Sequence, residues 1–303
     1  MANDKNEKNI TEKGVLYLVA TPIGNLADFT ERALKVLREV DFIAAEDTRN
    51  AVKLLNLLNI KKPLTSYFEH NKRERGIYIA GRIKDGESCA LITDAGTPAI
   101  SDPGEDLVKL CREQNIKVIA VPGACAAVCA LSVSGLYTGR FTFEGFLSVA
   151  KSKRLEHLQS LESEQRTMIF YEAPHKLHKT LEDMLNVFGD RKITLCRELT
   201  KINEEIIATT LGQAVELYNR ESASNVPIGE FVLVVEGKPK ADIEFEKSES
   251  FANMSYTEHT QLYIDDGYSK MDAIKKAAND RNIPKGKFYK ALLEETEENN
   301  KLE

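Results

Sequence analysis

The sequence predicts an α/β protein: two α/β domains, then a small helical segment at the C-terminal end. Short apolar runs alternate with longer amphipathic stretches through residues 14–122, whereas strand-type runs lie closer together in residues 123–237. Residues 254–303 contain only helix-type stretches. A length of 303 residues fits two ordinary domains of roughly 150 residues each, with a short appendage. With 42% hydrophobic and 29% charged residues, the chain is not a disordered, collagen-like or multi-span membrane protein.

The first domain is predicted to hold a parallel sheet. Residues 1–13 lack any apolar run, and we expect them to be disordered and to carry no secretion signal. The runs after them are apolar at every position, which is typical of parallel strands covered on both faces. The predicted strands are Val15–Ala20, Phe42–Ala45, Cys89–Thr93 and Val118–Val121. The amphipathic stretches between them, such as Thr30–Glu39, predict helices that cover this sheet.

The second domain is predicted to contain a mixed sheet, because some of its strands are close enough in sequence to pair as hairpins. The expected strands are Phe141–Leu147, Thr167–Tyr171, Ile193–Cys196, Glu205–Leu211 and Phe231–Glu236. The expected helices are Lys151–Ser163 and His175–Phe188. Residues 118–139 carry no charge and are long enough to span a bilayer, but Pro122-Gly123 interrupts them early. We interpret them as a buried strand that runs into a buried helix.

The C-terminal region changes character twice. Residues 238–253 are polar and acidic and contain a proline, which predicts a linker. Residues 254–303 predict three short helices, at 257–265, 270–280 and 284–295, the last two with helix-turn-helix dimensions. Lys270–Lys290 has a net charge of about +5, although the whole chain is at −6. We therefore expect an RNA-binding-like segment here, since binding depends on where positive charge is concentrated.

Several common chemistries find no support in the sequence. It contains no P-loop, no glycine-rich dinucleotide fingerprint and no GxSxG nucleophile elbow. The five histidines do not group with cysteine or acidic residues at ligand spacing, so we expect no metal site. Five cysteines without a CxxC pair, mostly in apolar runs, indicate reduced thiols and a cytoplasmic protein.

Turn-rich segments follow three of the predicted parallel strands. They are Thr21–Leu26, Asp94–Gly104 and Pro122–Ala124. Ligands of open α/β sheets bind outside the carboxyl ends of the strands, and small residues there let backbone amides approach a ligand. One such segment alone would be an ordinary turn. Three at one sheet edge predict a small-molecule site, for a nucleoside, a coenzyme or a sugar phosphate.

A set of longer motifs points to one family. In chain order they are Val19–Leu26 (VATPIGNL), Ala45–Arg49 (AEDTR), Ser66–Asn71 (SYFEHN), Thr93–Gly104 (TDAGTPAISDPG), Tyr171–His175 (YEAPH), Arg197–Lys201 (RELTK) and Pro227–Glu230 (PIGE). Together they resemble the ribosomal RNA small-subunit methyltransferase I family, of the tetrapyrrole-methylase-like class, over about residues 14–237. The resemblance implies transfer of a methyl group from S-adenosylmethionine to a ribose 2′-oxygen of a cytidine in 16S rRNA of the small ribosomal subunit. It also implies two α/β domains with the cofactor cleft between them, and a homodimer.

The resemblance further implies which residues form the cofactor site. They are Pro22, Ile23, Asp94, Ala95, Gly96, Thr97, Pro98, Ala99, Ala124, Ala126, Ala127, Tyr171, Glu172, Pro227, Ile228 and Gly229. The sequence departs mildly from the family pattern. Phe68 replaces a usual histidine, Ala124-Cys125 replaces a common Pro-Ser, and Lys176 replaces an arginine. The first departure weakens any acid–base role for position 68.

A ribose hydroxyl is a poor nucleophile until it loses its proton, so a general base is expected. The candidates are Glu46, Asp47, Glu198, and Lys201 with a lowered pKa, although each also has a structural interpretation as a cap or an ion pair. We expect Arg49, Arg197 and Lys201 to position RNA phosphates or the ribose. Two alternatives stay open from the residues alone: a methylase of a small tetrapyrrole-like acceptor, and a non-catalytic nucleic-acid-binding regulator.

Overall fold

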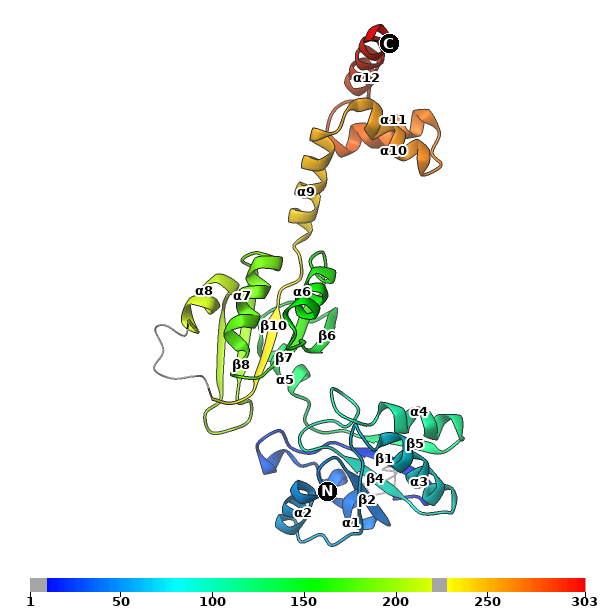
Figure 1. Ribbon diagram of the computed structural model, residues 1–303, viewed down its shortest axis with the longest axis vertical. Helices are drawn as coiled ribbons and strands as arrows, with labels where there is room; N and C mark the ends of the chain where they lie inside the picture. Colours follow the sequence, from blue (N-terminus) through cyan, green and yellow to red (C-terminus); the bar gives the residue numbers. More distant parts are fainter. Residues whose placement is uncertain (1–9, 220–227, 303) are drawn as a thin grey trace, which may run out of the picture. The chain divides into compact units, whose positions relative to one another are not determined.

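The computed structural model describes residues 10–219 and 228–302 (Figure 1). The chain divides into two compact units. One comprises the chain up to Ser160 together with Arg166–Glu236 and holds both sheets. The other comprises Leu161–Gln165 and the helices that follow Gly237. We describe each unit separately.

The first sheet is fully parallel, as predicted, in the order β3-β2-β4-β1-β5. Its strands are β1 (Val15–Val19), β2 (Phe42–Ala45), β3 (Leu64–Ser66), β4 (Cys89–Ile92) and β5 (Lys117–Val121). Its helices are α1 (Glu31–Glu39), α2 (Thr48–Leu57), α3 (Lys72–Lys84) and α4 (Glu105–Glu113), after a short 3-10 turn at Leu26–Asp28.

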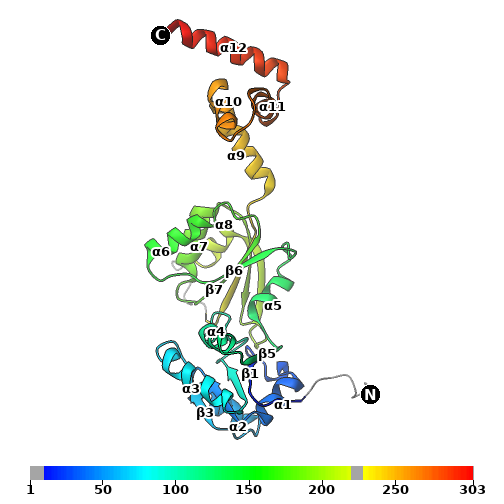
Figure 2. The same ribbon diagram turned by 90° about the vertical axis from the view of Figure 1, so that its right-hand side faces the viewer.

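Both faces of this sheet are buried, because successive side chains of a strand point to opposite sides. Along β1, Val15, Tyr17 and Val19 pack in one core with Leu37 of α1 and Leu55 of α2. The intervening Leu16 belongs to the opposite core, with Ile79 of α3 and Leu107 of α4. Figure 2 shows helices on either side of this sheet. Continuous apolar strands therefore reflect a sheet covered by helices on both faces.

The second sheet is mixed, in the order β6-β7-β10-β8-β9, with only the β6–β7 pair parallel. Its strands are β6 (Phe141–Phe146), β7 (Thr167–Glu172), β8 (Lys192–Arg197), β9 (Glu205–Thr210) and β10 (Phe231–Val235). Its helices are α5 (Ala126–Val133), α6 (Lys151–Ser160), α7 (Leu177–Phe188) and α8 (Leu211–Leu217). The uncharged run 118–139 is thus strand β5 followed by helix α5, as we interpreted it. The expected burial is wrong for the strand, because β5 lies at the edge of its sheet and only Val121 in it is buried. Within the part of the chain that is described, no helix has both the length and the apolarity to cross a membrane.

Two expectations about irregular segments are wrong. The expected linker 238–253 contains helix α9 (Lys240–Asn253), which starts just after Pro239, a position that tolerates proline. Polar composition therefore marked an exposed helix rather than a linker. Of the N-terminal stretch expected to be disordered, residues 1–9 lie outside the described residues, but 10–13 are held on the first domain: the Thr11 hydroxyl donates to Glu39 at 2.7 Å, and the Glu12 amide donates to the Tyr17 hydroxyl at 2.7 Å.

The second unit contains α9, α10 (Tyr256–Asp265), α11 (Lys270–Asp280) and α12 (Lys285–Leu302). Ser269 caps α11, as its position predicts, by accepting from the amide of Asp272. His259 is fully buried and accepts a hydrogen bond from Arg281 Nε at 3.0 Å, and its ring stacks on Phe251 of α9. The side chain of Arg281 is therefore committed to the packing of this unit.

Candidate active site

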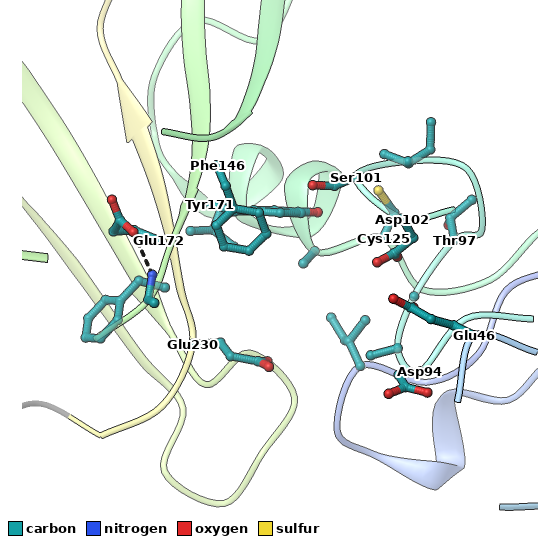
Figure 3. Close-up of a pocket in the computed structure, with 18 of the residues that line it drawn as sticks. Glu46, Asp94, Thr97, Ser101, Asp102, Cys125, Phe146, Tyr171, Glu172 and Glu230 are labelled. Carbon is teal, nitrogen blue, oxygen red and sulfur yellow. Dashed lines mark hydrogen bonds between the residues drawn. The ribbon is translucent and has the colours of Figure 1, made fainter. Parts of the chain in front are cut away.

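A cavity of about 450 Å³ opens at the carboxyl edge of the first sheet, within the unit that holds both sheets (Figure 3). The volume lies in the range of small-molecule sites. Residues that follow β1, β2, β4 and β5 form one wall, and residues at the ends of β6, β7 and β10 form the other. The lining comprises Ile23, Glu46, Asp94, Ala95, Gly96, Thr97, Ile100, Ser101, Asp102, Cys125, Ala126, Phe146, Tyr171, Glu172, Ala173, Pro174, Glu230, Phe231 and Val232.

The loop after β4 is fixed by hydrogen bonds at both ends. Gly96 exchanges two backbone hydrogen bonds with Thr21, at 2.9 and 3.1 Å, and the Thr97 hydroxyl donates to the carbonyl of Ala124 at 3.0 Å. Further along, Ala99 and Ser101 adopt positive φ of 67° and 66°, which is uncommon for residues other than glycine. Such strain persists where surrounding contacts enforce it, and it clusters at functional sites.

The opposite wall is built around Tyr171. Its hydroxyl accepts a hydrogen bond from the amide of Ala127 at 3.1 Å, and its ring contacts Phe143 and Phe146 edge to face. Burial raises the pKa of Tyr171 to about 12, so the phenol keeps its proton at neutral pH. Tyr171 therefore ties the start of helix α5 to the second sheet.

The cavity is acidic. Among the described residues, its lining contains the carboxyl groups of Glu46, Asp94, Asp102, Glu172 and Glu230 but no lysine, arginine or histidine. Burial, and next the charge of Glu46, raise the pKa of Asp102 to about 6. Excess negative charge in a half-buried site favours a positively charged ligand. No group of three His, Cys, Asp or Glu side chains suited to a metal ion occurs in the described part of the chain.

Eight of the expected cofactor residues line the cavity: Ile23, Asp94, Ala95, Gly96, Thr97, Ala126, Tyr171 and Glu172. Another seven do not line it: Pro22, Pro98, Ala99, Ala124, Ala127, Ile228 and Gly229. Three of those support it, since Ala124 and Ala127 hold Thr97 and Tyr171, and a Cβ on Gly104 would approach that of Ala99 to 2.8 Å. Pro227 lies outside the described residues.

Sequence reasoning missed part of the lining: Ile100, Ser101, Asp102, Cys125, Phe146, Ala173, Pro174, Glu230, Phe231 and Val232. For some a signal existed. Ser101 and Asp102 belong to the long loop that was singled out, and Glu230 directly follows the expected Gly229. Phe146 gave no such signal, because its position depends on how strand β6 pairs with β7.

The catalytic candidates separate into two sets. Glu46 lines the cavity and accepts a hydrogen bond from the Thr93 hydroxyl at 2.9 Å. Asp47 instead caps α2 and pairs with Arg49, whose hydrogen bonds hold the pKa of Asp47 at about 2. Arg49 itself is 85% exposed, which leaves most of its surface open to a ligand.

Glu198 and Lys201 form an ion pair just outside the cavity lining. Lys201 Nζ lies 2.7 Å from Glu198 and 3.3 Å from Glu230. Burial acts to lower the pKa of Lys201, but its hydrogen bonds to Glu198 and Glu230 outweigh burial and raise that pKa. The expectation of a lowered pKa is therefore wrong in direction, because the carboxylates stabilise the ammonium form.

Comparison with known proteins gives consistent matches. Residues 15–215 match the family described as "Tetrapyrrole (Corrin/Porphyrin) Methylases". The chain is 44% identical to "Ribosomal RNA small subunit methyltransferase I" of Bacillus subtilis, over 93% of this chain and 94% of that protein. It is 45% identical to the protein of the same name from Halalkalibacterium halodurans, over 97% of this chain and all of that one.

Solved structures share the fold at low identity. A uroporphyrin-III-C-methyltransferase from Thermus thermophilus aligns with a TM-score of 0.51 at 19% identity, over 73% of this chain and 94% of that one. A diphthine synthase aligns with a TM-score of 0.53 at 14% identity, over 73% of this chain and 90% of that one. At identities this low, the alignments show only that the fold is shared. The two-sheet unit has about the size of the aligned part of the chain.

Proposed function

Because the chain belongs to the tetrapyrrole (corrin/porphyrin) methylase family, among relatives named ribosomal RNA small subunit methyltransferase I, we propose that it methylates rRNA of the small ribosomal subunit with S-adenosylmethionine as donor. The expected acceptor is the ribose 2′-oxygen of a cytidine in 16S rRNA.

The acidic cavity is the observation that supports S-adenosylmethionine as the methyl donor. S-adenosylmethionine supplies a methyl group on a positively charged sulfur and also carries an ammonium group. The cavity offers carboxyl groups on both walls, among them Glu46, Asp94 and Glu230, and no basic side chain among the described residues that line it. Gly96 and Ala95 leave room for backbone contacts to a nucleoside. The residues present therefore fit this donor.

In this scheme the residues of the chain mainly orient the two substrates. The loop after β4 and the Tyr171 wall hold the donor, and the methyl group must face the acceptor oxygen in line with its sulfur. Orientation of this kind contributes up to about 7–11 kcal/mol in favourable model reactions. A positioned base adds on the order of 10²–10⁴-fold in rate.

Fewer basic side chains are available to bind RNA phosphates than the number of lysines and arginines in the sequence indicates. Arg82 pairs with Glu87, Arg154 is buried against Asp183, and Arg281 packs inside the helical unit. Arg49 stays exposed near the first wall of the cavity, and the six lysines of the stretch Lys270–Lys290 are exposed. These six are Lys270, Lys275, Lys276, Lys285, Lys287 and Lys290. We propose that they bind the RNA backbone.

Incubation of the full chain with labelled S-adenosylmethionine tests the function. We expect label in 16S rRNA of small subunits and none in a free tetrapyrrole acceptor, with the modified nucleotide mapped by primer extension at low dNTP concentration. Calorimetry should show donor uptake by the protein alone. Failure to bind the donor, with or without ribosomal particles, would refute the proposal, and label on the tetrapyrrole would favour the small-acceptor alternative.

We also propose a homodimer in the cytoplasm, as the family resemblance implies. All five cysteines are free thiols, and Cys89, Cys111 and Cys196 are buried, which supports a reducing compartment. Light scattering on the purified chain measures the oligomeric state directly. A mass of one chain, 33.9 kDa, over the working concentration range would exclude the dimer.

A further inference from the structure

The five carboxyl groups of the cavity differ in how their oxygens are occupied. Glu172 is saturated: it accepts from the Ala173 amide at 2.8 Å and from the Thr180 hydroxyl at 2.6 Å, and it pairs with Lys176. Glu230 is exposed and pairs with Lys201. A base that takes a proton from a substrate needs to be partly buried and to have a free hydrogen-bond acceptor position. Neither Glu172 nor Glu230 meets both conditions.

On the first wall, Asp94 accepts a hydrogen bond from the amide group of Asn50 at 2.8 Å and is exposed to solvent. Glu46 accepts a hydrogen bond from the Thr93 hydroxyl at 2.9 Å. Asp102 lies beside these two carboxylates and is half-buried. The Thr93 hydroxyl also interacts with it, which leaves its remaining acceptor positions open to a substrate, and no cationic side chain contributes to its electrostatic environment. Figure 3 shows Asp102 and Glu46 directed into the same part of the cavity.

From this accounting we propose that Asp102 is the catalytic base that accepts the proton of the acceptor hydroxyl. The inference rests on the proposed function. In the balanced step the O–H bond of the hydroxyl breaks and its proton passes to Asp102. The oxygen forms a bond to the methyl carbon of the donor, the C–S bond breaks, and its electron pair stays on sulfur, which becomes a neutral thioether.

The surroundings of Asp102 suit this exchange. The titratable groups around it are Glu46 after β2, Asp94 after β4, Tyr171 on β7 and Cys125 before α5. A bound cationic donor offsets the two carboxylates and keeps Asp102 ionised before transfer. Transfer removes that positive charge, so the affinity of Asp102 for a proton rises as the proton arrives.

The pH dependence follows from the same group. Burial, and next the charge of Glu46, raise the pKa of Asp102 to about 6 in the absence of donor. A base works only when deprotonated, so kcat/KM should fall about tenfold per pH unit as the pH drops below that value. Above it the rate should level off, because the base is already ionised.

The test compares Asp102→Asn with Asp102→Glu and with a control, Asp106→Asn. Asp106 lies four positions further along the chain, pairs with Lys72 and is not part of the cavity lining. For Asp102→Asn we expect a loss of about 10²–10⁴-fold in single-turnover rate on small subunits. The fall of its rate at low pH should vanish from the pH–rate profile, while its donor Kd should stay within about threefold of the wild-type value. Asp102→Glu should recover part of the rate, and Asp106→Asn should match the wild type.

A rate for Asp102→Asn within about threefold of the wild type, or a retained limb near pH 6, would overturn the inference. So would a loss of donor affinity by more than about tenfold, since Asp102 would then bind the donor rather than the proton. These results differ from a failure of the proposed function, in which the wild type itself neither binds the donor nor labels rRNA.

Discussion

At the scale of one residue, Lys201 shows that the charge state of a side chain depends on its hydrogen-bond partners. Its ammonium bridges Glu198 and Glu230, and their hydrogen bonds raise its pKa against the effect of burial. A lysine in this state cannot accept a proton at neutral pH. It can hold two loops together: the turn after β8 and the segment that leads into β10, where Glu230 lines the cavity.

Lys201→Met should therefore weaken donor binding more than turnover. Loss of the ammonium leaves two carboxylates facing each other. Hydrogen bonds to charged groups contribute about 1.5–3 kcal/mol, and the low end, which applies at this partly exposed site, is equivalent to about a tenfold rise in donor Kd. Calorimetry and the pH–rate profile measure both effects. Lys201→Arg should restore the affinity. A pH profile that loses its low-pH limb in Lys201→Met would contradict this assignment and make Lys201 part of the proton pathway.

The stem of Lys201 also explains Gly24 of the TPIGN motif. A Cβ at position 24 would lie 2.4 Å from Lys201 Cγ, so only glycine fits without moving the lysine. The motif was identifiable from sequence, but its contact with a residue 177 positions away was not. Long-range close approaches of this kind depend on how the two sheets pack, which local patterns do not encode.

At the scale of elements, the loop between β4 and α4 is the part of the site most sensitive to shape. Gly104 has φ of 154°, and a Cβ there would come within 2.8 Å of Ala99 Cβ and 3.0 Å of its amide nitrogen. Since Ala99 is itself at a positive φ, it has little freedom to yield. The contact fixes the turn that carries Ser101 and Asp102.

We therefore expect Gly104→Ala to raise the donor Kd by about tenfold, consistent with about 1–3 kcal/mol for an imposed backbone conformation. The melting temperature should also fall, by about 2–4 °C per kcal/mol for a unit of this size, because Gly104 is buried and the strain acts on the folded state. Gly81→Ala is the matched control: nothing lies within 4 Å of its Cβ position in α3, and alanine favours a helix. Equal donor affinity in the two variants would show that the loop tolerates displacement.

Helices and strands with a clear pattern of apolar residues were predictable from the sequence. Those that depend on tertiary contacts were not. Continuous apolar strands such as β1 and β4 identified the parallel sheet, because both of its faces are buried. β3 has only three half-buried residues, too few for a pattern. α8 follows β9 without a gap and is marked chiefly by its Thr210 cap. α9 has the composition of a linker, yet Phe251 anchors it on His259.

For the site, the same distinction holds. Loops at strand ends located one wall, because parallel strands share a carboxyl edge. The importance of Asp102 was not visible, since its raised pKa arises first from burial and then from the charges of Glu46 and Asp94, which follow two different strands. Which partners a carboxylate has is a property of the folded chain: Glu172 on the opposite wall pairs with Lys176, whereas no cationic side chain acts on Asp102.

At the scale of the whole molecule, some basic side chains are exposed to solvent and available to a ligand, whereas others are used in packing. The chain has a net charge of −6, yet the stretch Lys270–Lys290 carries six exposed lysines, while Arg281 in the same stretch is committed to His259. Lysines on a soluble surface are also ordinary, so their exposure alone does not establish RNA binding. Salt dependence distinguishes the two, because counterion release scales with the number of phosphates contacted.

The full chain with Lys285, Lys287 and Lys290 changed to glutamine is the sharpest test of this unit. All three side chains are exposed, on or next to the first turn of α12, so the packing of Phe288 and Leu292 should survive. If each contacts a phosphate, the log–log slope of RNA affinity against salt should flatten by about 2, at about 0.7 per contact on single strands. Donor Kd should be unchanged, since no residue of this unit lines the cavity. Three exposed lysines of the other unit, Lys53, Lys61 and Lys84, changed in the same way, form the control. An unchanged slope in the α12 variant, with its helical signal intact, would remove this unit from the RNA-binding surface.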